Sequence, residues 1–184
     1  MAKIYHASAT PLPIGTVLES RFIEDKLQFQ FHAISSALKE GEAVLKSLLL
    51  SDYWHQLGKP TLTFAFKETV LERIRASEFP DRPSRLASVF LSPTKHDIIR
   101  FREEVRGTND RPHLYTCRVA ADAPLFQADI AFVRGPNALA PIKEQIDYLI
   151  QQARLYWEGR KSDDPITEML APQRTVEITA EEDW

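Results

Sequence analysis

The chain has 184 residues, enough for one domain with a hydrophobic core, and its 43% hydrophobic and 27% charged residues are typical of a globular protein. A single cysteine excludes a disulfide framework. No apolar run reaches membrane-spanning length and the first residues do not resemble a secretory signal peptide, so we expect a cytoplasmic protein that does not bind membranes.

The net charge of −3 is unevenly distributed along the sequence. Between Arg73 and Arg118 there are nine arginines, one lysine and six acidic residues, so this segment carries +4 and the rest of the chain −7. A positive segment of this kind favours an anionic ligand. The sequence supports equally the alternative that these charges lie on solvated helix faces.

Strand and helix signals alternate irregularly in the first half of the chain. Lys3–Ser8 alternates and predicts a strand, and an alternation within residues 27–31 suggests an extended piece. Helical periodicity begins at Ala33 and recurs over Lys67–Ser77. The second helix is expected to end before Pro80, because a residue that precedes proline disfavours helical geometry.

The segment Pro83–Ser92 has an unusual strand pattern. Alternation places Ser88 and Phe90 on one side of the strand and Val89 and Leu91 on the other. A flat ring beside hydroxyl groups suits the wall of a binding site, because the ring can stack on a ligand that the hydroxyls hydrogen-bond. An edge strand with Phe90 in the core and the serines in solvent explains the same pattern, and this stretch alone favours that explanation.

The second half of the chain continues with mixed elements. Ser92 is expected to cap a helix that starts at Pro93. The other predicted elements are strands at Leu114–Ala120 and Leu125–Val133, a helix at Pro141–Glu158, and a strand at Thr167–Thr179 with a turn at Ala171-Pro172. Residues 181–184 are expected to form a loose acidic tail. Because no regular βαβ alternation is present, we predict an α+β fold in one domain over residues 1–180.

Common metal and nucleotide motifs are absent from the sequence. There is no glycine-rich phosphate loop, no HExxH and no CxxC pair, and the five histidines lack metal-ligand spacing, so we expect no metal. Three polar patches remain. They are Tyr5-His6 in the first strand, Ser88 with Phe90 in the central strand, and Glu168 before an apolar pair where a loop enters a strand.

The order of these patches resembles the ADP-ribosyltransferase fold, a short-stranded β core with inserted helices that bacterial mono-ADP-ribosylating toxins share with the poly-ADP-ribose polymerases. A closer resemblance is to a family of small bacterial and phage proteins with the motifs FP-x-x-PSR, S-x-F, A-x-x-YW-x-G and P-x-x-E-x-L. The matching stretches here are Phe79–Arg85, Ser88–Phe90, Ala153–Gly159 and Pro165–Leu170. Toxins that modify arginine have a second glutamate two residues before the catalytic one, where this chain has Ile166, so the resemblance is to the histidine-type branch.

The resemblance implies an enzyme that takes NAD as substrate, needs no metal, and transfers ADP-ribose to an unknown macromolecular acceptor, a protein or a nucleic acid. It implies catalytic roles for Glu168, beside the ribose, and for His6, on a ribose hydroxyl, with both residues and Phe90 lining one cleft. Cleavage of a glycosidic bond builds positive charge on the sugar, which a fixed carboxylate stabilises. The implied NAD contacts are Tyr5, Arg85 on the pyrophosphate, Ser88, Phe90 stacked on nicotinamide, and Trp157 as one wall.

Each of these residues also has a purely structural interpretation. Glu168 can be an exposed acid at a strand entrance, His6 a half-buried histidine, Arg85 a partner in a surface ion pair, and Phe90 a core residue. Tyr156 and Trp157 lie at the end of an amphipathic helical stripe, which favours core packing for both. Two other functions also fit the sequence. One is an NAD glycohydrolase, which uses water as the acceptor, and the other is a non-enzymatic module that binds nucleic acid or protein through the arginine-rich middle segment.

Overall fold

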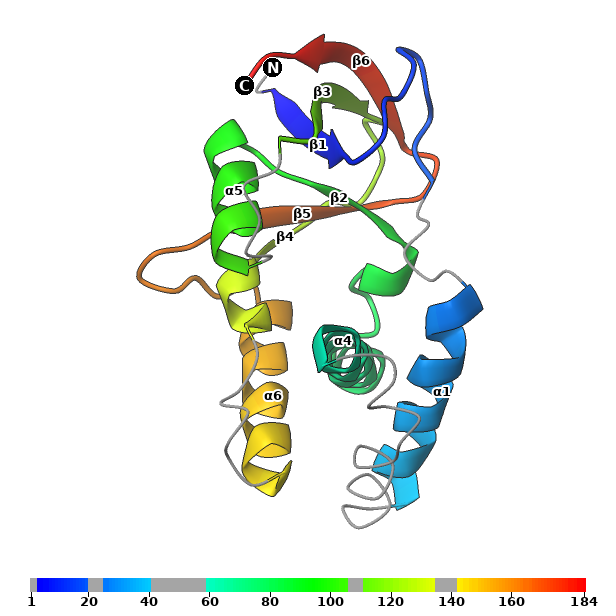
Figure 1. The fold of residues 1–184 in the computed structure, drawn as a ribbon, viewed down its shortest axis with the longest axis vertical. Coiled ribbons are helices and arrows are strands. Elements are labelled where there is room, and N and C mark those ends of the chain that lie inside the picture. Colours follow the sequence, from blue (N-terminus) through cyan, green and yellow to red (C-terminus); the bar gives the residue numbers. More distant parts are fainter. Residues whose placement is uncertain (1–2, 20–24, 41–58, 106–110, 135–141) are drawn as a thin grey trace.

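The β-strands form two antiparallel sheets that lie one above the other (Figure 1). The computed structural model describes residues 3–19, 25–40, 59–105, 111–134 and 142–184. Within these residues, the upper sheet of Figure 1 has the strand order β1-β3-β6 and the lower sheet the order β2-β5-β4. The strands are β1 (Ile4–Ser8), β2 (Ser88–Leu91), β3 (His113–Val119), β4 (Phe126–Asp129), β5 (Thr167–Pro172) and β6 (Val176–Glu182).

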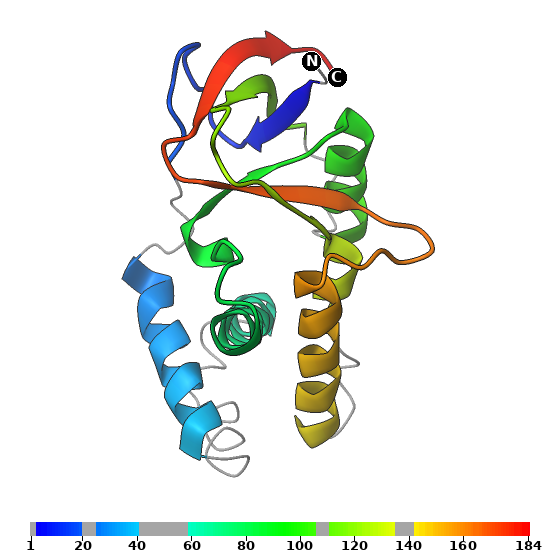
Figure 2. The ribbon, with the colours of Figure 1, turned by 180° about the vertical axis from the view of Figure 1, so that it is seen from behind.

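The helices α1 (Asp25–Glu40), α4 (Lys59–Glu78) and α6 (Ile142–Trp157) lie on the side of the β2-β5-β4 sheet that points away from the other sheet (Figures 1 and 2). The short helix α5 (Lys95–Arg100) lies beside the two sheets. Short 3-10 turns at Arg85–Ala87 and Ile130–Val133 and a π-helical turn at Phe101–Val105 complete the described elements. The elements do not alternate as βαβ units, both sheets are antiparallel, and the α+β prediction is confirmed.

The β2-β5-β4 sheet is buried on both faces, because it lies between the helices and the other sheet. Val89 and Leu91 pack in the core between the two sheets. Phe90 and its register partner Leu170 face the core on the helix side, and Ser88 shares their face by alternation. The predicted alternation of β2 is confirmed, and its hydroxyl and aromatic side faces the helices.

Several element boundaries follow from local sequence signals. α4 ends at Glu78, directly before the Phe79-Pro80 step, as predicted. α6 ends at Trp157, and Gly159 then has a φ of 73°, which glycine adopts without steric cost. Pro141, the first residue of the predicted helix, lies outside the described residues.

The helix after β2 begins later than predicted, because Ser92 still takes part in strand pairing. The N–H of Ser92 donates to the carbonyl of Tyr5, and the N–H of Tyr5 donates to the carbonyl of Ser92, both at 2.8 Å. Thr94 caps the helix instead, and its hydroxyl oxygen accepts from the N–H of Asp97 at 3.0 Å.

β4 ends at Asp129 instead of Val133, because the Asp129 carboxylate binds the backbone that follows. Oδ1 accepts from the N–H groups of Ala131 at 2.9 Å and Ile166 at 3.1 Å. Oδ2 accepts from the N–H and the hydroxyl of Ser162 at 2.8 and 2.7 Å. Burial acts to raise the pKa of Asp129, but these four hydrogen bonds lower it overall.

We expect Asp129→Ala to lower the free energy of unfolding by about 2–4 kcal/mol, because three backbone N–H groups, one buried and two partly buried, lose their acceptor. Asp129→Asn keeps one acceptor oxygen and should cost less. Because the pKa of Asp129 is lowered in the folded protein, its stabilisation is present above the unfolded pKa and is lost as pH falls through the folded pKa. Urea unfolding at several pH values measures both effects, and an alanine variant as stable as wild type contradicts the prediction.

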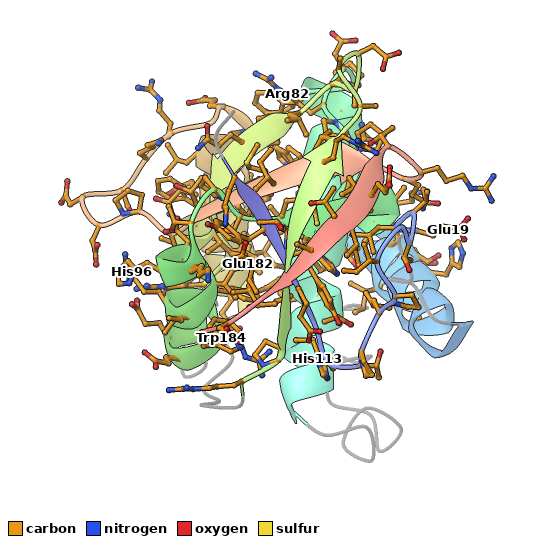
Figure 3. All side chains as sticks on the ribbon, turned by 90° about the horizontal axis from the view of Figure 1, so that it is seen from above. Glu19, Arg82, His96, His113, Glu182 and Trp184 are labelled. Carbon is orange, nitrogen blue, oxygen red and sulfur yellow. The ribbon has the colours of Figure 1, made fainter. Side chains whose placement is uncertain are left out.

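Three other sequence predictions are corrected by the structure. Residues 27–31 are helical and belong to α1, which packs along α4. An alternation over only five residues does not distinguish a strand from a helix. The chain reverses after Pro172 rather than at Ala171-Pro172, with Arg174 at a φ of 62°. The tail, expected to be loose, is instead fixed to the sheet. β6 pairs with β3 up to Glu182, and the indole N–H of Trp184 donates to the carbonyl of Pro112 at 2.8 Å. Figure 3 shows Trp184 and His113 at the same end of this sheet.

Candidate functional site

The turn that follows α4 is attached to this helix by two side-chain contacts. Ser84 donates from its hydroxyl to Glu72 at 2.9 Å, and Arg85 binds Glu68 through two hydrogen bonds. Glu68 and Glu72 are four residues apart and therefore lie on the same face of α4. Ser84 also caps the 3-10 turn that leads into β2. The face of α4 thus fixes the position of Arg85.

Arg85 is a buried cation shared by two carboxylates, and its side chain is 5% exposed. Its Nε and Nη2 donate to Glu68 at 3.0 and 3.1 Å. Its Nη1 donates to Oε1 of Glu168 and, at 2.7 Å, to the hydroxyl of Tyr156. Burial disfavours the charge of Arg85, but Glu168 and Glu68 outweigh this and raise its pKa further above the ordinary value. Glu68, Arg85, Tyr156 and Glu168 are called the Arg85 cluster below.

Glu168 is the second residue of β5 and is 7% exposed, so it is not the exposed strand-entry acid of the structural interpretation. Its Oε1 accepts from Arg85 and from the hydroxyl of Tyr156. Among the residues that the structure describes, no donor binds its Oε2. Burial raises the pKa of Glu168, the charge of Arg85 and the hydroxyl of Tyr156 oppose the rise, and the charge of Glu68 adds to it.

The backbone beside Glu168 is fixed from two sides. The N–H of Thr167 donates to Oδ1 of Asp97, in the first turn of α5, at 3.3 Å. The carbonyl of Thr167 accepts from the hydroxyl of Ser92, which directly follows β2, at 3.3 Å. The segment between β2 and α5 therefore sets where the carboxylate of Glu168 enters the Arg85 cluster.

Phe90 lies on the same face of the sheet as Glu168. Its register partner is Leu170, two residues after Glu168 on β5. The ring of Phe90 is half-buried, and the guanidinium carbon of Arg85 lies 4.9 Å from its centroid. Ser88 shares this face but is buried and donates to a backbone carbonyl of the preceding turn at 2.7 Å. The structure therefore brings Phe90, Arg85 and Glu168 together and uses Ser88 to hold the turn.

His6 lies where the two sheets diverge. In the described part of the chain, β1 bridges to β2 only at the pair Tyr5–Ser92; beyond it, β1 follows β3 and β2 follows β5. Nδ1 of His6 is 3.0 Å from the carbonyl oxygen of Phe90. Burial lowers the pKa of His6, more than this hydrogen bond raises it, which favours the neutral ring. Because a carbonyl only accepts, Nδ1 carries the proton and Nε2 is an acceptor.

His6 and Glu168 are not in direct contact. The register partner of His6 is Tyr115, which packs in the core between the sheets, whereas Glu168 faces the helices. His6 contacts the backbone carbonyl of Phe90. Glu168 binds Arg85, and the guanidinium of Arg85 lies over the ring of Phe90. A ligand that used both residues would have to pass the edge of β2 at Phe90. The expectation of one shared cleft is therefore not met by direct contact, and joint action of the two residues stays a prediction.

The other two predicted NAD contacts, Trp157 and Tyr5, differ in their surroundings. Trp157 is 0% exposed, its indole N–H donates to the carbonyl of Leu71 at 2.9 Å, and its ring stacks on Phe126. This location favours core packing and leaves Trp157 no surface with which to form the wall of a site. Tyr5 is half-buried, and the Nζ of Lys95 lies 5.9 Å from its ring centroid.

Sequence reasoning did not single out Glu68, and it assigned Tyr156 to core packing. Tyr156 is indeed fully buried, but its hydroxyl binds both Arg85 and Glu168. The sequence feature that could have pointed to Glu68 is its spacing of four residues from Glu72, in the helix that precedes Ser84 and Arg85. That spacing shows a common helix face but not which segment the face meets.

Arginines of the positive middle segment are extensively paired with acids of the same chain. The pairs are Arg75 with Glu72, Arg85 with Glu68 and Glu168, Arg100 with Glu104 and Asp164, and Arg118 with Glu177. These pairs offset much of the local charge that the sequence predicted for an anionic ligand. Among the described residues, no group of three or more His, Cys, Asp or Glu side chains could hold a metal ion. No helix in that part of the chain is both long and apolar enough to cross a membrane.

A family model covers most of the chain. The model of a family described as "Protein of unknown function (DUF2441)" matches residues 14–181. None of the curated proteins matches the chain. The matched range contains the whole Arg85 cluster and Phe90, whereas β1, with Tyr5 and His6, lies outside it.

Proposed function

We propose that this chain, which belongs to the DUF2441 family, cleaves the nicotinamide–ribose bond of NAD and transfers ADP-ribose to a protein or nucleic acid. The observation that carries the proposal is the carboxylate of Glu168, which is buried and fixed through Oε1 while Oε2 has no donor in the described residues. A finer fold assignment, an ADP-ribosyltransferase-like core, belongs to the same proposal. In its support, β2 pairs with β5, and Tyr5 of β1 bridges to Ser92, directly after β2, so the three sequence patches lie on adjacent segments.

The chemistry requires a negative charge beside the reacting sugar. As the bond between the ribose carbon and the nicotinamide nitrogen breaks, nicotinamide leaves with the electron pair and positive charge develops on the ribose. Glu168 would stabilise this charge, and its Oε2 would accept a hydrogen bond from a ribose hydroxyl. The acceptor nucleophile then bonds to the ribose carbon and loses its proton to Glu168 or to solvent.

The hydrogen-bonding polarity of the site supports a sugar as the ligand. Oε2 of Glu168 and Nε2 of His6 both accept hydrogen bonds, and neither has a donor among the described residues. Hydroxyl groups are the donors that a ribose presents. Phe90 is near both residues, because His6 binds its backbone carbonyl and Arg85, the partner of Glu168, lies over its ring. In this proposal the half-buried ring of Phe90 stacks on nicotinamide.

The role proposed for Arg85 differs from the one that the sequence suggested. A guanidinium that already donates to two carboxylates and a tyrosine has little capacity left for a pyrophosphate. We therefore propose that Arg85 holds Glu168 and does not bind the phosphates. This placement removes the main reason for expecting the positive segment to attract NAD.

Nicotinamide release tests the proposal. Purified protein is incubated with NAD labelled in the nicotinamide ring, with and without cell lysate as a source of acceptors. Release that depends on lysate supports a transferase, and equal release without lysate indicates a glycohydrolase with water as the acceptor. The absence of release and of NAD binding at millimolar NAD, by calorimetry, would refute both activities and favour a non-enzymatic binding module.

A further inference from the structure

We infer that Glu68 is a positioning residue, which holds Arg85 through Nε and Nη2 and thereby aims Nη1 at the carboxylate of Glu168. The inference deepens the proposed function, and its catalytic part, an effect of Glu68 on nicotinamide release, rests on that function. Glu68 does not touch Glu168 by any hydrogen bond; the two carboxylates meet only through Arg85.

The planar shape of the guanidinium is the first step of the argument. Its five N–H groups point in fixed directions within one plane. Glu68 occupies Nε and Nη2, the side of the fork that a carboxylate binds with two parallel bonds, at 3.0 and 3.1 Å. Once this side is fixed, the direction of Nη1 is fixed as well, and Nη1 is the nitrogen that donates to Glu168 and Tyr156.

The surroundings leave Glu68 no competing role. Its side chain is 4% exposed, on the face of α4 that receives the turn after the helix. The charged and titratable groups around it are Arg85 from the turn, Glu168 from β5, Tyr156 from α6 and Lys67 from α4 itself. Arg85 is the cation that Glu68 binds, through two hydrogen bonds, whereas no hydrogen bond or ion pair in the described residues joins Glu68 to Lys67.

Two variants separate the geometry of Glu68 from its charge. Glu68→Asp keeps the charge but shortens the side chain by one methylene, so the carboxylate withdraws from the fork. Glu68→Gln keeps the length but removes the charge, which acts to raise the pKa of Glu168. Glu78→Gln is the control, because Glu78 lies at the end of the same helix and binds Arg154 at the surface instead of Arg85.

The carboxyl carbon signals of labelled glutamate, followed by NMR over a pH titration, give a readout that needs no activity. The Glu168 signal is assigned by its loss in Glu168→Gln. In Glu68→Asp, which keeps the charge of Glu68, we expect its midpoint to move to higher pH, because a misdirected Nη1 offsets the effect of burial less; in Glu78→Gln the midpoint should stay in place. The same titration of Glu68→Gln separates the loss of the charge from the loss of alignment. An unchanged midpoint in folded Glu68→Asp would overturn the inference, whatever the outcome of the NAD assay.

The second measurement is the rate of nicotinamide release, at a temperature where each variant is folded. Glu68→Asp should lower kcat about 10-fold, with KM within about twofold, as expected when a positioned group is misaligned. Full kcat in folded Glu68→Asp would overturn the positioning role. Wild-type protein without any release would refute the proposed function, and the NMR titration would still decide whether Glu68 acts on Glu168.

Discussion

Replacing Glu168 by glutamine is expected to slow nicotinamide release from NAD by two or more orders of magnitude, about 3 kcal/mol of barrier. Glutamine preserves the size of the side chain and one acceptor oxygen, but it removes the charge that would stabilise the developing cation. The matched control is Glu177→Gln, which removes a carboxylate paired with Arg118 at the surface. This control should retain wild-type activity. Full activity in Glu168→Gln would place the catalytic acid elsewhere.

Glu168→Gln also requires a stability measurement, because Glu168 is buried and paired. We expect it to cost about 1–3 kcal/mol of unfolding free energy, so its melting temperature fixes the assay temperature. Because the pKa of Glu168 is raised, activity should fall on acidification at a higher pH than for an exposed glutamate. Stability should depend on pH in the opposite direction from activity. The favourable contribution of protonated Glu168 to the free energy of unfolding is complete below its unfolded pKa and is lost as pH rises through its folded pKa.

Replacing Arg85 by alanine is expected to lower the free energy of unfolding by about 3–5 kcal/mol, because it leaves two buried carboxylates without their shared cation. In a chain of this size, the melting temperature should fall by roughly 6–20 °C. Arg118→Ala removes an arginine of an exposed pair and should change stability by less than about 1 kcal/mol.

The pH dependence identifies the cause of the Arg85 effect. Without Arg85, the effect of burial, which raises the pKa of Glu168, is offset less, so acidification neutralises this carboxylate and the stability difference from wild type should shrink. Denaturant unfolding at neutral and mildly acidic pH measures this difference. A loss that is small, or that does not vary with pH, would show that Arg85 is not the counter-ion of a charged cluster.

The sequence was most informative where local chemistry decides the structure. The alternation of Ser88, Val89 and Phe90 correctly assigned the faces of β2, and the Phe79-Pro80 step correctly ended α4. It was misleading where a side chain redirected the backbone. The apolar run around Asp129 predicted a continuing strand, but the carboxylate caps a 3-10 turn.

The partners of the candidate site could not be predicted from local patterns. The sequence analysis named Arg85 as a pyrophosphate contact or a surface ion-pair partner, but its burial depends on how the face of α4 with Glu68 docks against the turn. Trp157 is the opposite case, a predicted site residue that lies in the core. An aromatic residue at the end of an amphipathic helix is compatible with both positions until the packing is known. Such assignments require tertiary contacts, which residue spacing along one element does not contain.

The wide sequence spacing of the Arg85 cluster has a consequence for the folding pathway. Arg85 is 71 residues from Tyr156 and 83 residues from Glu168, so these contacts close long loops and have high contact order. We expect these buried ion pairs to form after the rate-limiting barrier, with φ-values near zero at Arg85 and Glu168. Substitutions there should therefore accelerate unfolding and leave the refolding rate almost unchanged. The lifetime of the native state would then depend on the same ion pairs that position the carboxylate.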